Sequence, residues 1–315
     1  MTQTAVAERP RVGLGTKLAY GVGSVAYGAK NSLMGALLFY YSDLKHLPAH
    51  WVSLALAVSV VIDALWDPTV GQVSDTTTTR LGRRHPFMYF AAAPVAICFA
   101  LLWNPPNISP NGLILYMSVL IVVLRMMISL YEVPNSALAP ELAPNYDERT
   151  SLLAYRYLFG TVGGAAVTIM GLLVFLHRTP EFPLGQKNVA AYGPYAITVA
   201  IIMFVSILAS TMGTHKQIPF LRKPPRTSPG LKAIVGQIVV TLTNRNFVVL
   251  ALSGMIFGVS NGLGSGLQLY FTTYLWELPT NMQAVVLFGG IFASIAGVIA
   301  APIFAKRFGK KQTCI

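Results

Sequence analysis

Two aspartates, Asp63 and Asp67, lie inside an apolar segment that begins at Trp51 and is long enough to cross a membrane. A spacing of four residues places both carboxylates on one face of a helix. Ionisable groups at membrane depth are costly, usually face a protein interior or a wet cavity, and indicate an ion or proton site. Two carboxylates one turn apart repel each other unless a cation, a proton or a base lies between them. We therefore predict a cation site at this pair, for Na⁺ or for H⁺.

Four more ionisable residues lie in neighbouring apolar segments: Lys30, Arg125, Glu132 and Arg156. Counting about 1.5 Å per residue from the segment ends places all six charges in one layer. Hard cations take oxygen ligands, so Glu132 and Ser129 are further candidate cation ligands, with Asn135 nearby. The alternative is that three acids and three bases pair permanently and brace the bundle without binding any ligand.

The composition indicates an integral membrane protein. Of 315 residues, 54% are hydrophobic and 11% are charged, with a mean hydropathy of +0.58, whereas about 25% are charged in soluble domains. The net charge of +12 lies in short loops, which indicates membrane orientation and not nucleic-acid binding. The sequence has no phosphate-binding loop, no His/Cys metal spacing and no nucleophile elbow. We therefore expect no enzyme, and no cofactor beyond a coupling ion.

Eight apolar segments are candidate membrane spans: 18–42, 51–73, 86–103, 112–138, 151–176, 191–212, 247–275 and 283–305. If the N-terminus lies in the cytoplasm, Lys45, Arg178 and Lys187 are the only Lys or Arg residues in loops on the opposite side of the membrane. Because cytoplasmic loops carry the excess of Lys and Arg, this asymmetry predicts a cytoplasmic N-terminus.

The predicted fold is all-α and has two unequal parts. Residues 1–16 form a cytoplasmic tail, 17–213 a bundle of six helices, 214–246 a basic linker with an amphipathic helix, and 247–315 part of a second bundle. A pattern of Arg-x-Gly-basic-basic follows both the second span, at 80–84, and the eighth, at 307–311. Parallel six-helix halves are the internal repeat of major facilitator transporters. We therefore expect one whole half and the first two helices of a truncated second half.

At these residues the sequence resembles the glycoside-pentoside-hexuronide:cation symporter family of the major facilitator superfamily. The shared landmarks follow one another over about residues 15–165: Tyr20-Gly21, Asp43, Ile62-Asp63-Ala64-Leu65-Trp66-Asp67-Pro68, Gly71, Asp75, Arg80-x-Gly82-Arg83, Tyr131-Glu132-Val133-Pro134, Glu148-Arg149-Thr150 and Tyr155-Arg156. The resemblance implies that Asp63, Asp67 and Glu132 bind a cation, that Arg156 contributes to a sugar site nearby, and that the two halves rock about both.

Further roles complete this expectation. The predicted substrate-binding residues are Arg156, Tyr27, Lys30, Asn135 and Tyr131, and Arg125 belongs to the charge network. The predicted cytoplasmic gate motif consists of Asp75, Arg80, Gly82, Arg83 and Arg84. Two positions depart from the family: Lys30 lies near the place of an aspartate, and Ser136 replaces an aromatic ring. An ammonium at Lys30 could stand in for Na⁺ and favour protons or uncoupled transport.

The predicted function is symport of a sugar or glycoside with Na⁺ or H⁺ across a bacterial inner membrane. The protein is expected to be a monomer in contact with membrane lipid. One alternative is a transporter of lysophospholipid-like or other organic solutes, because animal lysophospholipid transporters share much of the pattern. The others are a nonfunctional truncated fragment, a structural membrane component, or a channel, for which the sequence has no repeated filter.

Overall fold

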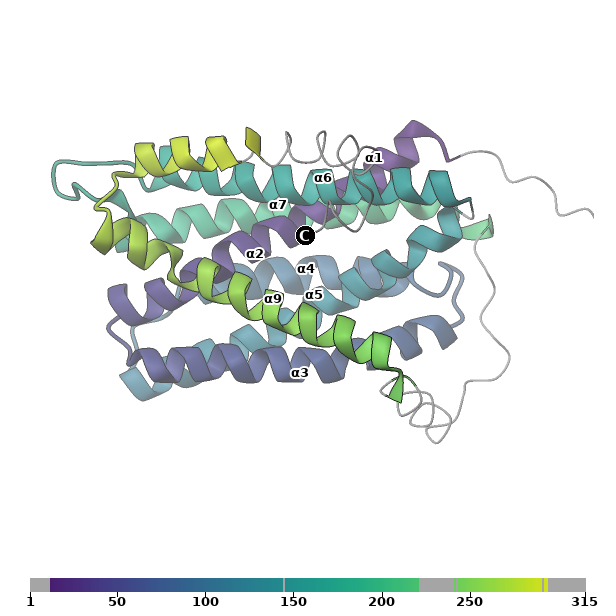
Figure 1. Cartoon of the computed structure of the whole chain (residues 1–315), viewed down its shortest axis with the longest axis horizontal. Helices are drawn as coiled ribbons and strands as arrows, with labels where there is room; N and C mark the ends of the chain where they lie inside the picture. Colours follow the sequence, from purple (N-terminus) through teal and green to yellow (C-terminus); the bar gives the residue numbers. More distant parts are fainter. Residues whose placement is uncertain (1–11, 144, 221–240, 242, 291, 294–315) are drawn as a thin grey trace, which may run out of the picture.

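The computed structural model describes residues 12–143, 145–220, 241, 243–290 and 292–293. The described part consists of helices and their connections (Figure 1): α1 (Leu14–Val22), α2 (Ser24–Phe39), η1 (Tyr40–Leu44), α3 (Ala49–Thr76), α4 (His85–Trp103), α5 (Pro110–Leu142), α6 (Tyr146–Met170), η2 (Gly171–Phe175), η3 (Gly185–Lys187), α7 (Val189–His215), η4 (Ile218–Phe220), α9 (Arg245–Tyr270) and η5 (Phe271–Leu275). Residues 280–290 are also helical. The expected amphipathic helix, most of the linker and the second basic motif lie outside the described residues.

Six segments of the described chain are helical, long and apolar enough to cross a membrane: 49–76, 85–103, 110–142, 148–175, 189–215 and 245–275. They match the second to seventh predicted spans. The first predicted span is divided at Gly23, where a side-chain carbon would come within 1.6 Å of the Tyr131 hydroxyl of α5. The described part of the eighth begins at Thr280, and the rest of this predicted span lies outside the described residues.

The first bundle is held together by close helix pairs. The packed pairs are α2 with α6, α4 with α7, and α5 with both α3 and α4. Glycines permit the closest of these approaches, since a side-chain carbon on Gly28 of α2 would lie 2.0 Å from the Gly160 carbonyl oxygen of α6. Large aromatic side chains such as Tyr20, Tyr41 and Trp103 fill the space between the helices.

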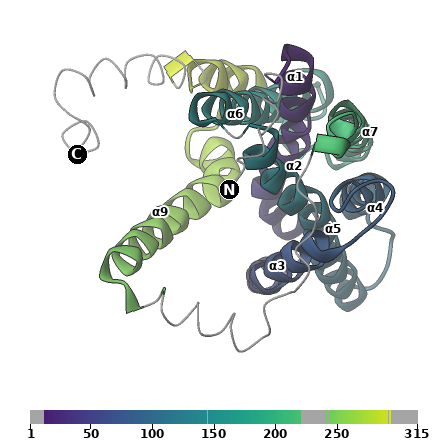
Figure 2. The same cartoon turned by 90° about the vertical axis from the view of Figure 1, so that its right-hand side faces the viewer.

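Helix α9 packs on α2 and leaves much of its length uncovered. Gly35 of α2 meets Ser265 of α9, where a side-chain carbon on the glycine would lie 2.9 Å from the serine carbonyl. No residue of α9 is buried, and side-chain carbons on its glycines would meet nothing within 4 Å in the described structure. Gly262, Gly264 and Gly266 of α9 therefore make no close helix contact with the described residues. Figure 2 shows α9 leaning away from α3.

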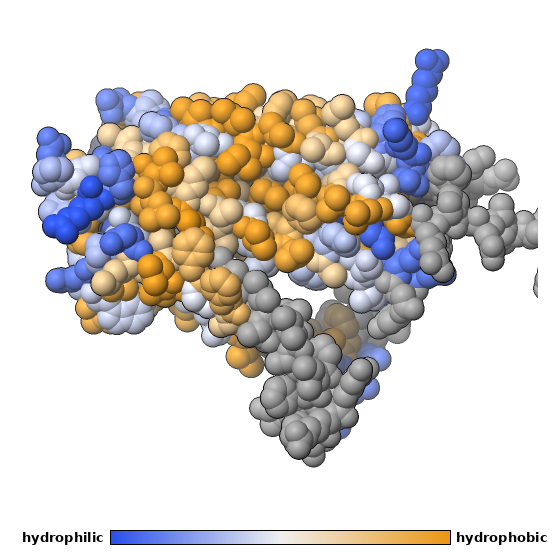
Figure 3. Space-filling model, turned by 90° about the horizontal axis from the view of Figure 1, so that it is seen from above, coloured by the Kyte–Doolittle hydropathy of each residue, from blue (hydrophilic) through white to orange (hydrophobic). Residues whose placement is uncertain are grey.

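The molecule has two polar ends separated by an apolar band. In Figure 3 hydrophobic side chains cover the middle and hydrophilic ones gather at both ends, as expected for a protein that spans a bilayer. We call the end that carries the loop 77–84 the motif end, and the other the opposite end. The predicted topology places the motif end in the cytoplasm.

The first and seventh spans end in the same way. Each finishes in a π-helical turn, η1 or η5, followed by a residue with positive φ, His46 or Glu277. The backbone bonds also correspond, since Leu47 N–H donates to the Tyr41 carbonyl and Leu278 N–H donates to the Thr272 carbonyl. All these pairs are 231 residues apart, a local correspondence that agrees with the predicted repeat.

Candidate functional site

Asp63 is the most fully engaged acid of the charged layer. Its Oδ2 lies 3.3 Å from Arg125 Nη1, and its Oδ1 accepts a hydrogen bond of 2.8 Å from the Ser129 hydroxyl. Arg125 and Ser129 lie one turn apart on α5, so they reach α3 together. Ser129, which the sequence suggested as a cation ligand, therefore contacts the carboxylate of the predicted cation site.

Glu132 and Arg156 form a second ion pair, between α5 and α6. Arg156 Nη2 donates to Glu132 Oε2 at 2.6 Å, and its Nη1 donates to the Tyr20 hydroxyl of α1 at 3.4 Å. About a fifth or less of each charged side chain is exposed. The guanidinium predicted to bind sugar is thus oriented by the glutamate predicted to bind the cation.

Asp67 differs from the other two acids because it forms no ion pair with a described residue, whereas Asp63 and Glu132 each pair with an arginine. Its Oδ1 is buried and has no hydrogen-bond partner among the described residues. The same holds for Glu132 Oε1 and for both amide atoms of Asn135, which is fully buried one turn after Glu132. Buried polar atoms without partners are costly, so sites that keep several of them indicate a bound ion, solute or water.

Lys30 lies among these groups without pairing directly with an acid. Its side chain is 8% exposed, its ammonium lies 4.9 Å from the centre of the Tyr27 ring, and no described carboxylate lies within 4.0 Å. It remains within electrostatic range of Asp63, Asp67, Glu132 and Arg125. Asp67 and Lys30 are therefore the two charges of the layer left over by the pairs Asp63–Arg125 and Glu132–Arg156.

The remaining predicted residues lie in different environments. Tyr131 is fully buried, with its hydroxyl against Gly23, whereas Tyr27 is about two-fifths exposed. The three acids do not converge on one point, since no group of three metal-binding His, Cys, Asp or Glu side chains occurs in the described ranges.

The gate motif is a compact charge cluster at the motif end. Arg84 Nη2 lies 2.8 Å from Asp75 Oδ1, and Arg84 Nη1 lies 2.9 Å from Glu141 Oε1 and 2.6 Å from the Ala137 carbonyl. Arg83 pairs with Glu141 and lies 3.7 Å from Asp75. The cluster ties the loop 77–84 to the ends of α3 and α5.

Two details of this cluster bear on the sequence interpretation. Gly82 has a φ of +77°, which only glycine adopts readily, and Arg80 is exposed. Glu141 was not identified from the sequence, although it is an acid at the end of the fourth span, on the side of the basic loop. That shared side was the signal that could have pointed to it.

The opposite end is closed by contacts between the first bundle and η5. The Tyr274 hydroxyl lies 2.7 and 2.8 Å from the two Asp43 carboxylate oxygens, and the Lys187 ammonium lies over the Tyr274 ring. Gln186 donates to the Thr273 hydroxyl, and the Ser42 and Tyr270 hydroxyls are hydrogen-bonded. These contacts join the first and seventh spans at this end, whereas α9 leans away from α3 toward the other.

A family model described as MFS/sugar transport protein matches residues 19–315. The chain belongs to this family. Its resemblance to the glycoside-pentoside-hexuronide:cation symporters is confirmed, as are the all-α major facilitator fold and the integral membrane location. The family is one of transporters and not of enzymes.

Curated relatives come from bacteria and animals. The chain is 29% identical to the uncharacterized symporter sll1374 of Synechocystis over 74% of its length, 24% identical to the isoprimeverose transporter of Lactiplantibacillus pentosus over 95%, and 32% identical to the sodium-dependent lysophosphatidylcholine symporter 1 of Gallus gallus over 96%. The matched regions cover 42%, 60% and 62% of these relatives. The chain therefore spans less than two thirds of the length of each.

Proposed function

We propose that this chain carries the cation site and part of the solute site of a secondary transporter of the bacterial inner membrane. The transporter moves a sugar or glycoside together with Na⁺ or H⁺, and its N-terminus lies in the cytoplasm. The observation that supports coupling is the open carboxylate of Asp67, beside two acids that arginines already neutralise. If every acid of the charged layer were paired with a base, the layer would stabilise the bundle, and no carboxylate oxygen would be left to bind an ion.

The coupling follows from the position of Glu132. One of its oxygens holds Arg156 and the other is buried without a described partner. A cation bound between Asp67 and the free oxygen of Glu132 would compete with Arg156 for the same carboxylate. The guanidinium would then be released toward solute hydroxyls, so that cation binding raises solute affinity. Lys30 is the internal competitor for Asp67, and a proton is favoured over Na⁺ where the ammonium stays close.

The direct test is uptake by the full 315-residue chain in proteoliposomes. A panel of radiolabelled sugars and glycosides is offered with an inward Na⁺ gradient, with an inward H⁺ gradient, and with neither. We expect one gradient to stimulate uptake of at least one solute and Asp67→Asn to reduce that stimulation at least tenfold. Glu181→Gln, on the exposed loop before η3, is the matched control and should leave it unchanged. Equal stimulation in Asp67→Asn would remove this carboxylate from the mechanism.

A second candidate solute is a lysophospholipid. The 32% identity to the lysophosphatidylcholine symporter of Gallus gallus supports including it. Lysophosphatidylcholine is therefore offered in the same assay under the same three gradients. Stimulated uptake of this lipid, without uptake of any sugar, would replace the sugar proposal while keeping the role of Asp67.

A further inference from the structure

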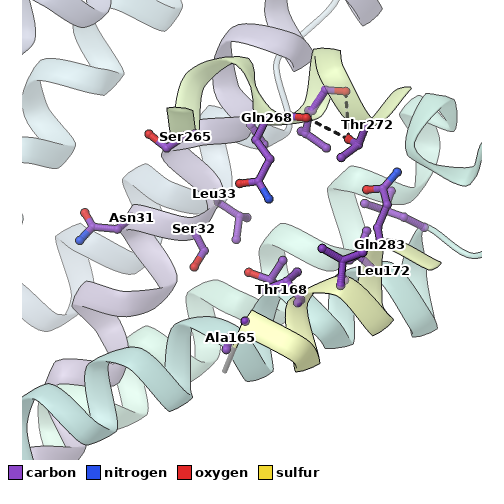
Figure 4. Close-up of a pocket in the computed structure, with 18 of the residues that line it drawn as sticks. Asn31, Ser32, Leu33, Ala165, Thr168, Leu172, Ser265, Gln268, Thr272 and Gln283 are labelled. Carbon is purple, nitrogen blue, oxygen red and sulfur yellow. Dashed lines mark hydrogen bonds between the residues drawn. The ribbon is translucent and has the colours of Figure 1, made fainter. Parts of the chain in front are cut away.

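A cavity of about 820 Å³ lies between α2, α6, α9 and the helical residues 280–290. Figure 4 shows Gln268 reaching from α9 toward Ser32 of α2 and Thr168 of α6, with Gln283 at the far side. Small-molecule sites usually have volumes of about 300 to 1,000 Å³, so the cavity is large enough for a disaccharide-sized solute.

The lining of the cavity is mostly apolar and carries a few polar groups, none of which is charged. Among the described residues that form it, no lysine, arginine, histidine, aspartate or glutamate occurs. Ser32 and Thr168 both donate to the Gly164 carbonyl, so their oxygens remain available as acceptors. The side-chain amide of Gln268 has no hydrogen bond to any described residue and offers both a donor and an acceptor.

This lining selects for a class of ligand. Hydroxyl and amide groups match the hydroxyls of a neutral solute, and the rings of Trp276 and Tyr195 provide apolar faces on which a sugar ring can lie. A carboxylate, phosphate or ammonium placed here would lose hydration without gaining an opposite charge, which is costly. The cavity therefore favours neutral hydroxylated solutes over charged ones.

The cavity adjoins the charged layer without being part of it. On α6 its first lining residue, Thr161, follows Arg156 by five positions, which is about 7.5 Å along the helix axis. On α2 its first lining residue, Asn31, directly follows Lys30. Two helices thus connect the cation site to this cavity, and the contacts of Tyr274 with Asp43 close the opposite end beyond it.

We infer that this cavity is the binding site for a neutral glycoside, and that Gln268 of α9 is its specificity-determining residue, reading solute hydroxyls together with Ser32 and Thr168. The inference rests on the proposed transport function and adds residues outside the charged layer to the recognition of the solute. In the absence of the coupling cation, binding is expected not to require Asp67, whose carboxylate raises solute affinity only through the cation that it binds.

The test uses quenching of tryptophan fluorescence in the purified full chain, because Trp276 lines the cavity. The probes are 4-nitrophenyl β-D-xylopyranoside and 4-nitrophenyl β-D-galactopyranoside, with the anionic 4-nitrophenyl β-D-glucuronide as the charged counterpart. We expect saturable quenching by at least one neutral probe, at least tenfold weaker for the glucuronide. Trp276→Phe should lose at least half of the quench, whereas Trp51→Phe should retain it.

The decisive variant is Gln268→Leu, which keeps the volume and removes the hydrogen bonds. We expect its Kd for the neutral probe to rise at least tenfold, while Gln72→Leu on the exposed side of α3 leaves Kd unchanged. An unchanged Kd in Gln268→Leu, equal quenching by the glucuronide, or no quenching by any probe would overturn the inference. The proposed function fails separately, when Asp67→Asn leaves cation-stimulated uptake intact in protein that still shows Gln268-dependent quenching.

Discussion

Within the charged layer, the partner of each side chain decides what that side chain can do. Asp63 is shared between Arg125 and Ser129, and Glu132 holds Arg156, so neither acid is free to accept a cation with its full charge. Asp67 keeps a buried oxygen without a described partner. Two aspartates four positions apart on one helix thus differ: the carboxylate of Asp63 is held by Arg125 and Ser129, whereas the carboxylate of Asp67 keeps an oxygen that can accept an ion.

The pair of Asp63 and Arg125 should behave as one structural unit. Arg125→Met leaves a carboxylate at membrane depth with only Ser129 as partner, and removing one member of a buried ion pair costs about 3 to 5 kcal/mol. We expect a clear loss of thermal stability in detergent, measured by tryptophan fluorescence. The double variant Asp63→Asn with Arg125→Met should recover most of that loss. Strictly additive effects of the two changes would show that the pair is not coupled.

Among the elements, the contact of α2 with α6 is the closest helix approach around the site. It depends on backbone atoms meeting at Gly28 and Gly160, with no side chain between them. This close approach places Lys30, two residues after Gly28, beside the helix that carries Arg156. The glycines of α9 contribute no comparable contact in the described structure.

Gly28→Ala should therefore destabilise the bundle, because the new carbon would lie 2.0 Å from a carbonyl oxygen and the helices must separate. Overpacking of this kind typically costs about 1 to 3 kcal/mol. Gly262→Ala on α9 is the matched control, since nothing lies within 4 Å and alanine favours the helix by about 1 kcal/mol. The midpoint of thermal unfolding should be lower for Gly28→Ala than for Gly262→Ala. Similar midpoints in the two variants would contradict the close packing of α2 on α6.

At the scale of the whole molecule, the first and seventh spans contact each other through residues at corresponding positions of the two spans. Asp43 and Tyr274 occupy equivalent positions after 231 residues and bond to each other, and Phe39 stacks edge-on against its equivalent, Tyr270. Contacts between corresponding residues of the first and seventh spans therefore close the opposite end. Helix α9 leans away from α3 toward the motif end (Figure 2), whereas η5 contacts the first bundle at the opposite end.

Tyr274→Phe should weaken that seal, because it removes the hydroxyl that bonds Asp43. A change of about 1 kcal/mol corresponds to roughly a fivefold shift between closed and open forms. We expect a thiol reporter, Gln268→Cys in a background with Cys98→Ser and Cys314→Ser, to react about fivefold faster with an impermeant maleimide added from the opposite end. Tyr157→Phe, at an exposed site on α6, should not change the rate. Equal rates in both variants would show that this hydrogen bond does not hold the seal.

The second to seventh membrane spans could be predicted from the chain alone. Hydropathy depends on local composition and on the bilayer thickness, so the segment predicted at 86–103 is found at 85–103 and the one at 51–73 at 49–76. The pairing of charges could not be predicted, because it depends on how each helix is rotated toward neighbours 62 residues away in the case of Asp63 and Arg125. Helix rotation also decides that Asp67 stays open, that Glu141 joins the gate cluster, and that Gln268 faces a cavity rather than lipid.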